Sequence, residues 1–152
     1  MLNVLLFGSI GVLAETSEIQ RQAYNQSFEE HGLDWYWSIA NYCELLKIPG
    51  GKRRLNDFAN VNLSNDVLNS IHERKESIFY EKLKVGLNPR DGVTDCINVC
   101  RKKDIKIGFI TTTSQNNIDA LAQALHKSIN LKQFDLITTK SDVYTEKPSG
   151  EI

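Results

Sequence analysis

Hydrophobic and polar positions follow two kinds of pattern along the chain. Near the N-terminus, residues 2–7 form a short, mostly apolar run that ends at Gly8. A run of this length, ended by glycine, predicts a strand buried on both faces, as in parallel sheets. Two further apolar runs, 106–111 and 134–139, predict a second and a third strand. In open α/β sheets, ligands bind at loops that leave the carboxyl ends of the strands, so the loop Gly8–Thr16 is where we first expect a site.

Between and after these strands, apolar residues recur at helical spacing. The helices that this spacing predicts cover residues 17–30, 39–46, 52–59, 65–84, 93–101 and 114–127. Strands that alternate with helices indicate βαβ units and a parallel sheet. The chain therefore predicts an α/β fold, with a core built from residues 1–16 and 87–152 and an all-helical insertion at residues 17–86.

Composition limits the class of protein. The chain has 152 residues, of which 41% are hydrophobic and 24% are charged, and its formal net charge is −1. The balanced charge argues against nucleic acid or an anionic membrane as partner. No stretch approaches the roughly 18 apolar residues of a membrane span, and no basic leader precedes the first strand. Three cysteines, an odd number, fit a reducing compartment, so we expect a cytoplasmic protein.

Two groups of polar side chains stand where predicted strands end. Thr111, Thr112, Thr113 and Ser114 follow the second strand and lead into a helix N-terminus, an arrangement that suits an oxyanion. A Lys-Pro pair, Lys147-Pro148, follows the third strand. Gly8–Thr16, after the first strand, carries no Asp, Lys, His or Cys.

Taken in order, these features resemble the haloacid dehalogenase (HAD) superfamily over essentially the whole chain. The insertion resembles the helical cap of its CbbY and β-phosphoglucomutase group. That likeness is carried by His31–Trp37, Tyr42, Leu45-Leu46 and Gly50–Arg54. The resemblance implies a Rossmann-like core and a relation to sugar-phosphate phosphatases and phosphomutases.

The chemistry of that family needs two aspartates in the first loop, spaced D-x-D. The first is the nucleophile and also a Mg²⁺ ligand, and the second is the general acid and base. When Phe7 and Gly11 are matched to the family pattern, the two positions fall on Gly8 and Ile10. Neither side chain can attack phosphorus, transfer a proton or hold a metal. The resemblance therefore predicts a relative without catalytic residues and without a metal cofactor, although its relatives use Mg²⁺.

The anion-binding part of the family pattern is kept. The resemblance implies that Thr111, Thr112 and Lys147 contact a phosphate. A buried ammonium without a partner is costly, so Lys147 should recruit an anion or a nearby carboxylate such as Asp142. We expect phosphate or a sugar phosphate as ligand, bound without a metal, with a solvated Lys147 in a vestigial site as the alternative.

In the cap, the resemblance implies that Lys52 and Arg54 face the substrate. By sequence alone, the basic run Lys52-Arg53-Arg54 is more typical of a solvated helix face. Trp35 and Trp37 suit stacking on a sugar, and burial within the cap is their other interpretation.

The chain stops at Ile152, where the family pattern continues with two more core strands. We expect either a fragment of a longer protein or a partner chain that covers the edge of the first strand, because a bare apolar edge promotes aggregation. Two functions stay open. One is a non-catalytic homologue that binds a sugar phosphate, or that serves a protein partner or a second copy of itself. The other is an active phosphatase with an unusual nucleophile.

Overall fold

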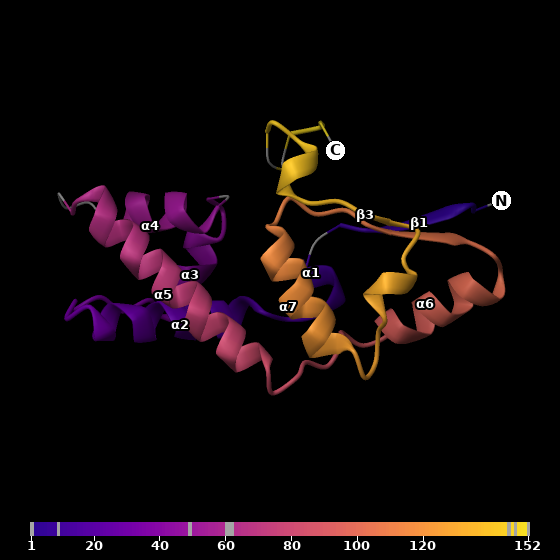
Figure 1. The fold of residues 1–152 in the computed structure, drawn as a ribbon, viewed down its shortest axis with the longest axis horizontal. Helices are drawn as coiled ribbons and strands as arrows, with labels where there is room; N and C mark the ends of the chain where they lie inside the picture. Colours follow the sequence, from indigo (N-terminus) through magenta and orange to yellow (C-terminus); the bar gives the residue numbers. More distant parts are fainter. Residues whose placement is uncertain are drawn as a thin grey trace. The chain divides into compact units, whose positions relative to one another are not determined.

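The computed structural model describes residues 2–8, 10–48, 50–59, 63–145, 147 and 149–151 (Figure 1). Its contacts divide the chain into two compact units. One unit, here the α/β unit, consists of Met1–Thr16 and Leu83–Ile152. The other, the helical unit, consists of Ser17–Lys82. The α/β unit is thus assembled from two segments that are separated in the sequence.

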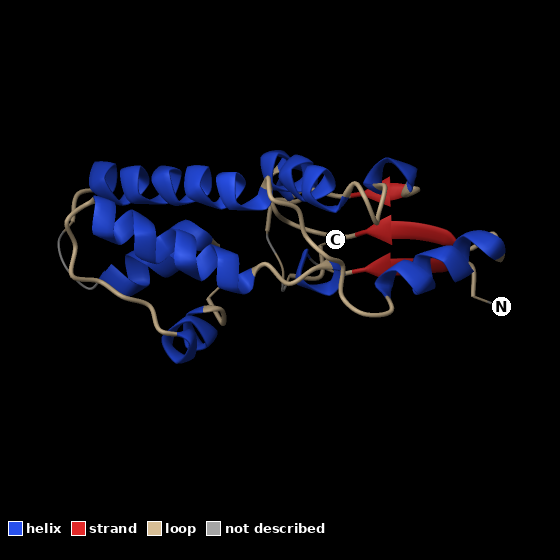
Figure 2. Ribbon diagram, turned by 90° about the horizontal axis from the view of Figure 1, so that it is seen from below, coloured by secondary structure: helices blue, strands red, loops and turns tan. Residues whose placement is uncertain are grey.

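The α/β unit is built on a parallel sheet of three strands, β1 (Val4–Phe7), β2 (Lys106–Phe109) and β3 (Leu136–Ile137), in the order β1-β2-β3. Figure 2 shows the three strands side by side and pointing the same way. Leu6 pairs with Gly108, which in turn pairs with Leu136, so these residues form one row across the sheet. The predicted parallel α/β fold is confirmed, although each strand is shorter than its apolar run.

Helices of the α/β unit lie on one side of this sheet in Figure 1. The 3₁₀ turn η2 (Lys140–Asp142) follows β3 in the sequence. The elements on the one side are α1 (Ile10–Leu13), α6 (Val93–Lys102) and α7 (Gln115–Leu125), with the 3₁₀ turn η1 (Leu131–Gln133). Their apolar residues form a single core with the strands. The fully or nearly buried members include Phe7, Leu13, Ile97, Ile107, Phe109, Ile118, Leu121 and Leu125.

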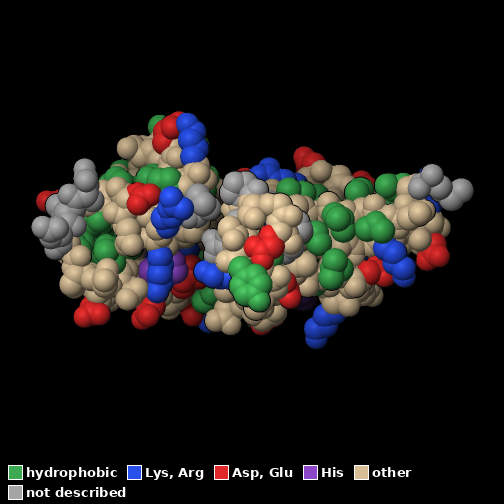
Figure 3. Space-filling view, turned by 90° about the horizontal axis from the view of Figure 1, so that it is seen from above, with side chains coloured by type: hydrophobic (Ala, Val, Ile, Leu, Met, Phe, Trp, Pro, Cys, Tyr) green, Lys and Arg blue, Asp and Glu red, His purple; other side chains and the backbone are tan. Residues whose placement is uncertain are grey.

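The opposite face of the sheet is exposed. Val4 is 46% exposed, Leu6 55% and Leu136 51%, whereas Phe7 on β1 is buried. Figure 3 shows hydrophobic side chains gathered over the α/β unit on the side seen from above. The expectation that the first strand is buried on both faces is therefore wrong. Successive strand residues point to opposite faces, and the α/β unit's core lies on only one of them.

The helical unit contains α2 (Ser17–Glu30), α3 (Ile39–Leu45), α4 (Gly51–Ala59) and most of α5 (Asn65–Leu83). Each lies within two residues of the predicted bounds. The core of the unit is aromatic and centres on the buried Trp37, whose ring centroid lies 4.4 Å from that of Tyr24, 5.1 Å from Phe28 and 5.6 Å from Tyr42. Within the described ranges, no helix is long and apolar enough to cross a bilayer.

Candidate anion-binding site

Gly8 follows β1 directly, and α1 begins at Ile10. A Cβ added at Gly8 would meet no atom within 4 Å, so this position opens onto free space. Ile10 is half-buried and packs against the core of the α/β unit. The helical turn at Ile10–Leu13 was not predicted, because a segment of Ile, Gly, Val and Leu carries no helix signal of its own.

Arg90 holds this loop in place. Its main-chain N–H donates to the Leu13 carbonyl at 2.8 Å, and its guanidinium donates to the Gly11 carbonyl and to the Glu15 carboxylate. Three points of the loop are thus fixed by one residue that is far away in the sequence. No pattern in the sequence singled out Arg90, because nothing in its neighbourhood predicts which carbonyls it will meet.

Lys147 places its ammonium at the carboxyl ends of β1 and β2. Its Nζ donates to the carbonyl of Gly8 and to the carbonyl of Ile110, each at 2.6 Å. An ammonium has three N–H donors, so one is left over. Lys147 makes no ion pair with a carboxylate in the described part of the chain. Pro148, its partner in the Lys-Pro pair, lies outside the described residues.

Asp142, the carboxylate that we expected as an alternative partner for Lys147, does not pair with it. It accepts hydrogen bonds from the main-chain N–H of Thr139 at 2.7 Å and from the Thr139 hydroxyl at 3.0 Å. These bonds close a capping box at η2. The local turn thus uses the carboxylate, and the positive charge of Lys147 stays available.

The threonine-rich segment forms a hydrogen-bonded turn beside the same strand ends. Thr111 is buried, and its hydroxyl accepts the N–H of Thr113 at 3.2 Å. Its own N–H donates to the Thr138 hydroxyl at 2.9 Å, which joins the end of β2 to the end of β3. Thr112 is half-buried, and Ser114 caps the N-terminus of α7. The Lys147 ammonium thus contacts the ends of β1 and β2 at Gly8 and Ile110, and Thr111 follows Ile110 in the chain. That Lys147, Thr111 and Thr112 bind a phosphate stays a prediction.

The two basic residues assigned to the cap lie in the helical unit and already have partners there. Lys52 is exposed and donates to the Asn69 side chain at 2.9 Å. The guanidinium of Arg54 donates to the carbonyls of Leu45 (2.8 Å) and Ile48 (3.1 Å), at the C-terminal end of α3. This geometry gives Arg54 a structural role in the helical unit and leaves Lys52 as the accessible cation of the pair.

A second polar group, which the sequence did not reveal, lies inside the helical unit on α5. Lys75 is 3% exposed, and its Nζ donates to the Glu76 carboxylate at 2.7 Å. Burial lowers the pKa of Lys75, and burial likewise lowers the pKa of His72, to about 4. The stretch is mostly charged in the sequence, and only the packing of α5 shows that Lys75 points inward while Glu73 and Arg74 remain exposed.

Magnesium, which the family resemblance implies, does not fit the residues described. Gly8 and Ile10 have no side-chain oxygen, whereas Mg²⁺ is bound through oxygen ligands, carboxylates above all. Throughout the described residues, no three side chains of His, Cys, Asp or Glu gather so that they could hold a metal ion. Among the described residues at these strand ends, the side chain that carries a charge toward β1 and β2 is the Lys147 ammonium.

The class of protein to which this fold belongs is shown by comparison with a family model. The model of the haloacid dehalogenase-like hydrolase family matches residues 10–152, and the chain belongs to that family. It is homologous to the protein CbbY of Rhodobacter capsulatus, with 33% identity over 157 residues that cover 99% of this chain and 68% of that protein.

Two solved structures of CbbY from Rhodobacter sphaeroides are similar to the chain. One, in complex with phosphate, has a TM-score of 0.84 at 33% identity. The other, a mutant in complex with xylulose-(1,5)bisphosphate, has a TM-score of 0.83 at 32% identity. Each comparison covers 98% of this chain and 68% of the CbbY chain.

Proposed function

We propose that this protein is a metal-independent phosphate or sugar-phosphate binding member of the HAD-like hydrolase family that does not catalyse phosphoryl transfer. In this proposal the α/β unit is the family core and the helical unit is its cap. The observation that carries it is the ammonium of Lys147, held at the ends of β1 and β2 beside Gly8 with no described carboxylate to pair with.

Loss of catalysis follows from the residues at the loop after β1. The proposal places Gly8 and Ile10 at the nucleophile and acid–base positions of the family. Removing a covalent nucleophile typically costs several orders of magnitude in rate. Ile10 packs against the core, so no proton-transferring group stands at the start of α1.

The proposed anion binding rests on the positive charge of Lys147, which no aspartate at position 8 balances. In a member with an aspartate at Gly8, a carboxylate would stand next to the Lys147 ammonium. Here two main-chain carbonyls orient the ammonium but do not neutralise it. A phosphate oxygen would accept the remaining N–H in a charge-assisted hydrogen bond. Thr112 and the N-terminus of α7 would supply further donors at the same end of the sheet.

The CbbY complexes support the choice of ligand. CbbY from Rhodobacter sphaeroides is described in complex with phosphate and, as a mutant, in complex with xylulose-(1,5)bisphosphate. In this chain Lys147 would contact a phosphate group of such a ligand. Lys52, exposed in the helical unit, remains the cap residue that the family resemblance assigns to the substrate. Arg54 is a weaker candidate because its guanidinium is already bonded to carbonyls.

The proposal is tested by calorimetric titration with inorganic phosphate and with xylulose-(1,5)bisphosphate, both without metal. We expect saturable binding that weakens about tenfold or more in Lys147→Ala, because a charged hydrogen bond contributes roughly 1.5–3 kcal/mol. The matched control is Lys132→Ala, which removes an exposed lysine of the same unit and should leave the affinity unchanged. Absence of binding, or equal loss in both variants, would refute the proposed site.

Turnover is tested with p-nitrophenyl phosphate and Mg²⁺. The starting chain should show no hydrolysis above background. Activity in the starting chain would instead establish the alternative, a phosphatase with an unusual nucleophile. The double variant Gly8→Asp plus Ile10→Asp then shows whether restoring both carboxylates is sufficient to restore the reaction.

A further inference from the structure

A hollow lies wholly within the helical unit, between α2 and the segment that follows it. Its volume is about 750 Å³, within the range of roughly 300–1,000 Å³ that ligand pockets occupy. Its lining residues are Asn25, Gln26, Glu29, Glu30, Trp35 and Tyr36. None of them belongs to the anion-binding site described above.

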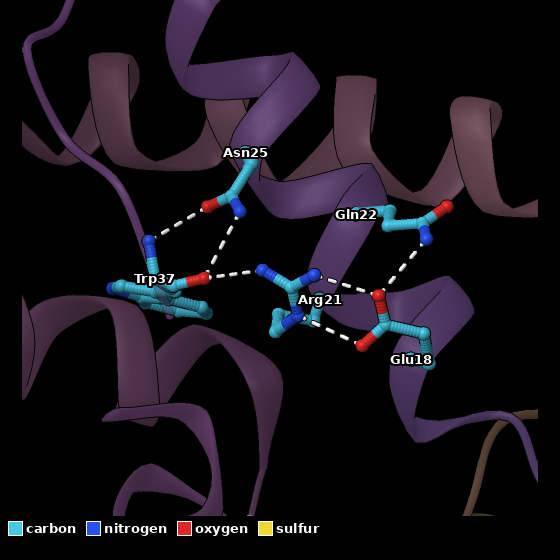
Figure 4. A network of polar contacts seen from close by, with 5 residues as sticks. All are labelled: Glu18, Arg21, Gln22, Asn25 and Trp37. Atoms are coloured by element: carbon cyan, nitrogen blue, oxygen red, sulfur yellow. Dashed lines mark hydrogen bonds and ion pairs between the residues drawn. The ribbon is translucent and has the colours of Figure 1, made fainter. Parts of the chain in front are cut away.

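The segment that forms one wall of the hollow is fixed by a polar network (Figure 4). The Asn25 side chain accepts the Trp37 N–H at 2.8 Å and donates to the Trp37 carbonyl at 3.0 Å. The buried Arg21 donates to the same carbonyl at 2.6 Å and forms a two-pronged pair with Glu18. The backbone beside Trp35 and Tyr36 is therefore held before any ligand arrives, which lowers the entropic cost of binding.

The two aromatic walls present ring surface to the hollow. Tyr36 is 67% exposed, and the Arg21 guanidinium lies 5.9 Å from its ring centroid. Trp35 stands edge-on to Phe28 and Phe58, with ring centroids 5.5 and 5.6 Å away, and remains half-buried. Packing thus supports both rings without covering them.

The charge at the rim of the hollow is negative. Glu29 and Glu30 both line it. Glu30 is paired with Arg74, and the hydrogen bonds from Arg74 and Gln26 lower its pKa to about 2. Glu29 forms no ion pair with any residue that the structure describes, so its charge is not balanced there.

We propose that this hollow binds the guanidinium of an arginine side chain carried by a partner polypeptide. An electron-rich ring face next to an unpaired carboxylate attracts a cation through both the ring quadrupole and the charge. An anionic ligand would be repelled by Glu29, whose charge is not balanced by a described residue. The planar guanidinium would lie on the free face of Tyr36 and donate to the Glu29 carboxylate, the bidentate geometry that arginine favours.

The test is an NMR titration of the whole chain, without phosphate, with the capped peptide Gly-Gly-Arg-Gly-Gly. Its neutral counterpart carries citrulline in place of arginine. We expect saturable shifts of the Asn25 side-chain amide and the Trp35 indole N–H with the arginine peptide only. Glu29→Gln and Tyr36→Ala should each weaken the affinity about two- to fivefold, as expected for cation–π and ion-pair contacts at partly exposed sites.

The matched control is Glu73→Gln, which removes an exposed carboxylate of the same unit outside the hollow. It should leave the titration unchanged. Equal binding of the citrulline peptide, equal loss in Glu73→Gln, or absence of saturation would each overturn the proposal. Glu29 and Tyr36 are exposed, so both variants should keep the fold, and an unchanged midpoint of urea unfolding verifies this.

Discussion

Under the proposed function Gly8 stands at the nucleophile position of the family, and its surroundings make this assignment testable. A side chain there would enter open space, and the backbone is not in the left-handed region. Gly8→Asp should therefore change the free energy of unfolding by less than about 1 kcal/mol. The new carboxylate should pair with Lys147, whose Nζ already contacts the Gly8 carbonyl, and weaken phosphate binding about tenfold in calorimetry.

Gly8→Asn is the control for this substitution, because it adds the same volume without the charge. Its affinity for phosphate should stay within about threefold of the starting chain, a difference of less than 1 kcal/mol. If Gly8→Asp binds phosphate as tightly as Gly8→Asn, the Lys147 ammonium is not the anchor of the anion.

Gly51 illustrates a glycine that packing requires. A Cβ at this first residue of α4 would lie 2.7 Å from the Tyr24 hydroxyl and 2.9 Å from His72 Nε2. Alanine is favoured over glycine by about 1 kcal/mol in helices, yet the fully buried Tyr24 cannot move aside freely. We expect Gly51→Ala to lower the free energy of unfolding in urea by about 1–2 kcal/mol. Arg53→Ala, exposed on the same helix, should change it by less than about 0.5 kcal/mol.

His72 should make the stability of the protein depend on pH. Burial lowers its pKa from 6.5 to about 4; nearby Lys75 and Lys52 add to this, and Glu76 and Glu73 oppose it. The unfolded chain takes up a proton near pH 6.5 while the folded chain keeps the ring neutral, so stability falls as the pH falls from about 7 toward 4. Between pH 7 and pH 5 we expect a loss of about 1–2 kcal/mol in urea titrations.

The matched variants for that experiment are His72→Gln and His126→Gln. His72→Gln removes the titrating ring and should flatten the pH dependence between pH 7 and pH 5. His126 is exposed, so His126→Gln should leave the dependence as it is. An unchanged slope in His72→Gln would assign the effect to another group.

At this scale, sequence reasoning located residues whose roles depend on where a strand ends. That rule placed Lys147 and Thr111 at strand ends, and the Lys147 ammonium contacts Gly8 and Ile110, the residue before Thr111. Their assignment to a phosphate came from the family resemblance and stays a prediction. Arg90 and Arg54 were beyond its reach, because the carbonyls they contact are chosen by tertiary packing. The sequence indicates which residues lie at strand ends, but it does not indicate which distant main-chain groups a side chain will contact.

Among the elements, α1 and its flanking loop depend on a single side chain. Arg90 ties Gly11 and Glu15 to the segment before α6. Arg90→Ala should lower the free energy of unfolding only by about 0.5–1 kcal/mol, because the pair with Glu15 is half-exposed. Hydrogen exchange of the amides at residues 10–16 should nevertheless rise well above that of the rest of the unit.

The control for Arg90→Ala is Arg101→Ala, which removes an exposed arginine of α6. It should leave exchange at residues 10–16 unchanged. Equal exchange in the two variants would mean that the loop is held by its own packing rather than by Arg90.

Helices were predicted more accurately than strands, for a physical reason. The bounds of α2 follow from local signals, a long periodic stripe that stops at Gly32, whose φ is +67°. By contrast, the apolar run at 134–139 yields only the two-residue β3, because strand length is set by the partner strand rather than by the run itself. The prediction that β1 is buried on both faces was wrong for a similar reason, because tertiary packing decides which faces of a sheet are covered.

At the scale of the whole molecule, the exposed face of the sheet should govern behaviour in solution. The row that joins Leu6, Gly108 and Leu136 lies on this face together with Val4. Large exposed apolar patches promote association. We expect the protein to bind the dye ANS and to self-associate as concentration rises, seen in sedimentation velocity.

The double variant Leu6→Gln plus Leu136→Gln should reduce both effects and keep the fold, because both side chains are about half-exposed. Val85→Gln, at a 91% exposed position outside the sheet, is the control and should leave both unchanged. Undiminished dye binding in the double variant would place the apolar surface elsewhere.

The division of the α/β unit into two segments has a consequence for how the chain folds during synthesis. Among the residues that the structure describes, β1 pairs only with β2, and Val4 meets Lys106 about a hundred residues later. At 5–20 residues per second, the ribosome leaves β1 without its strand partner for roughly 5–20 s. The helical unit, by contrast, is continuous and rich in local contacts, so it can complete its core within that interval. The order of folding is thus the reverse of the order of synthesis. The helical unit folds first, and β1, which is synthesised first, is among the last elements to pair.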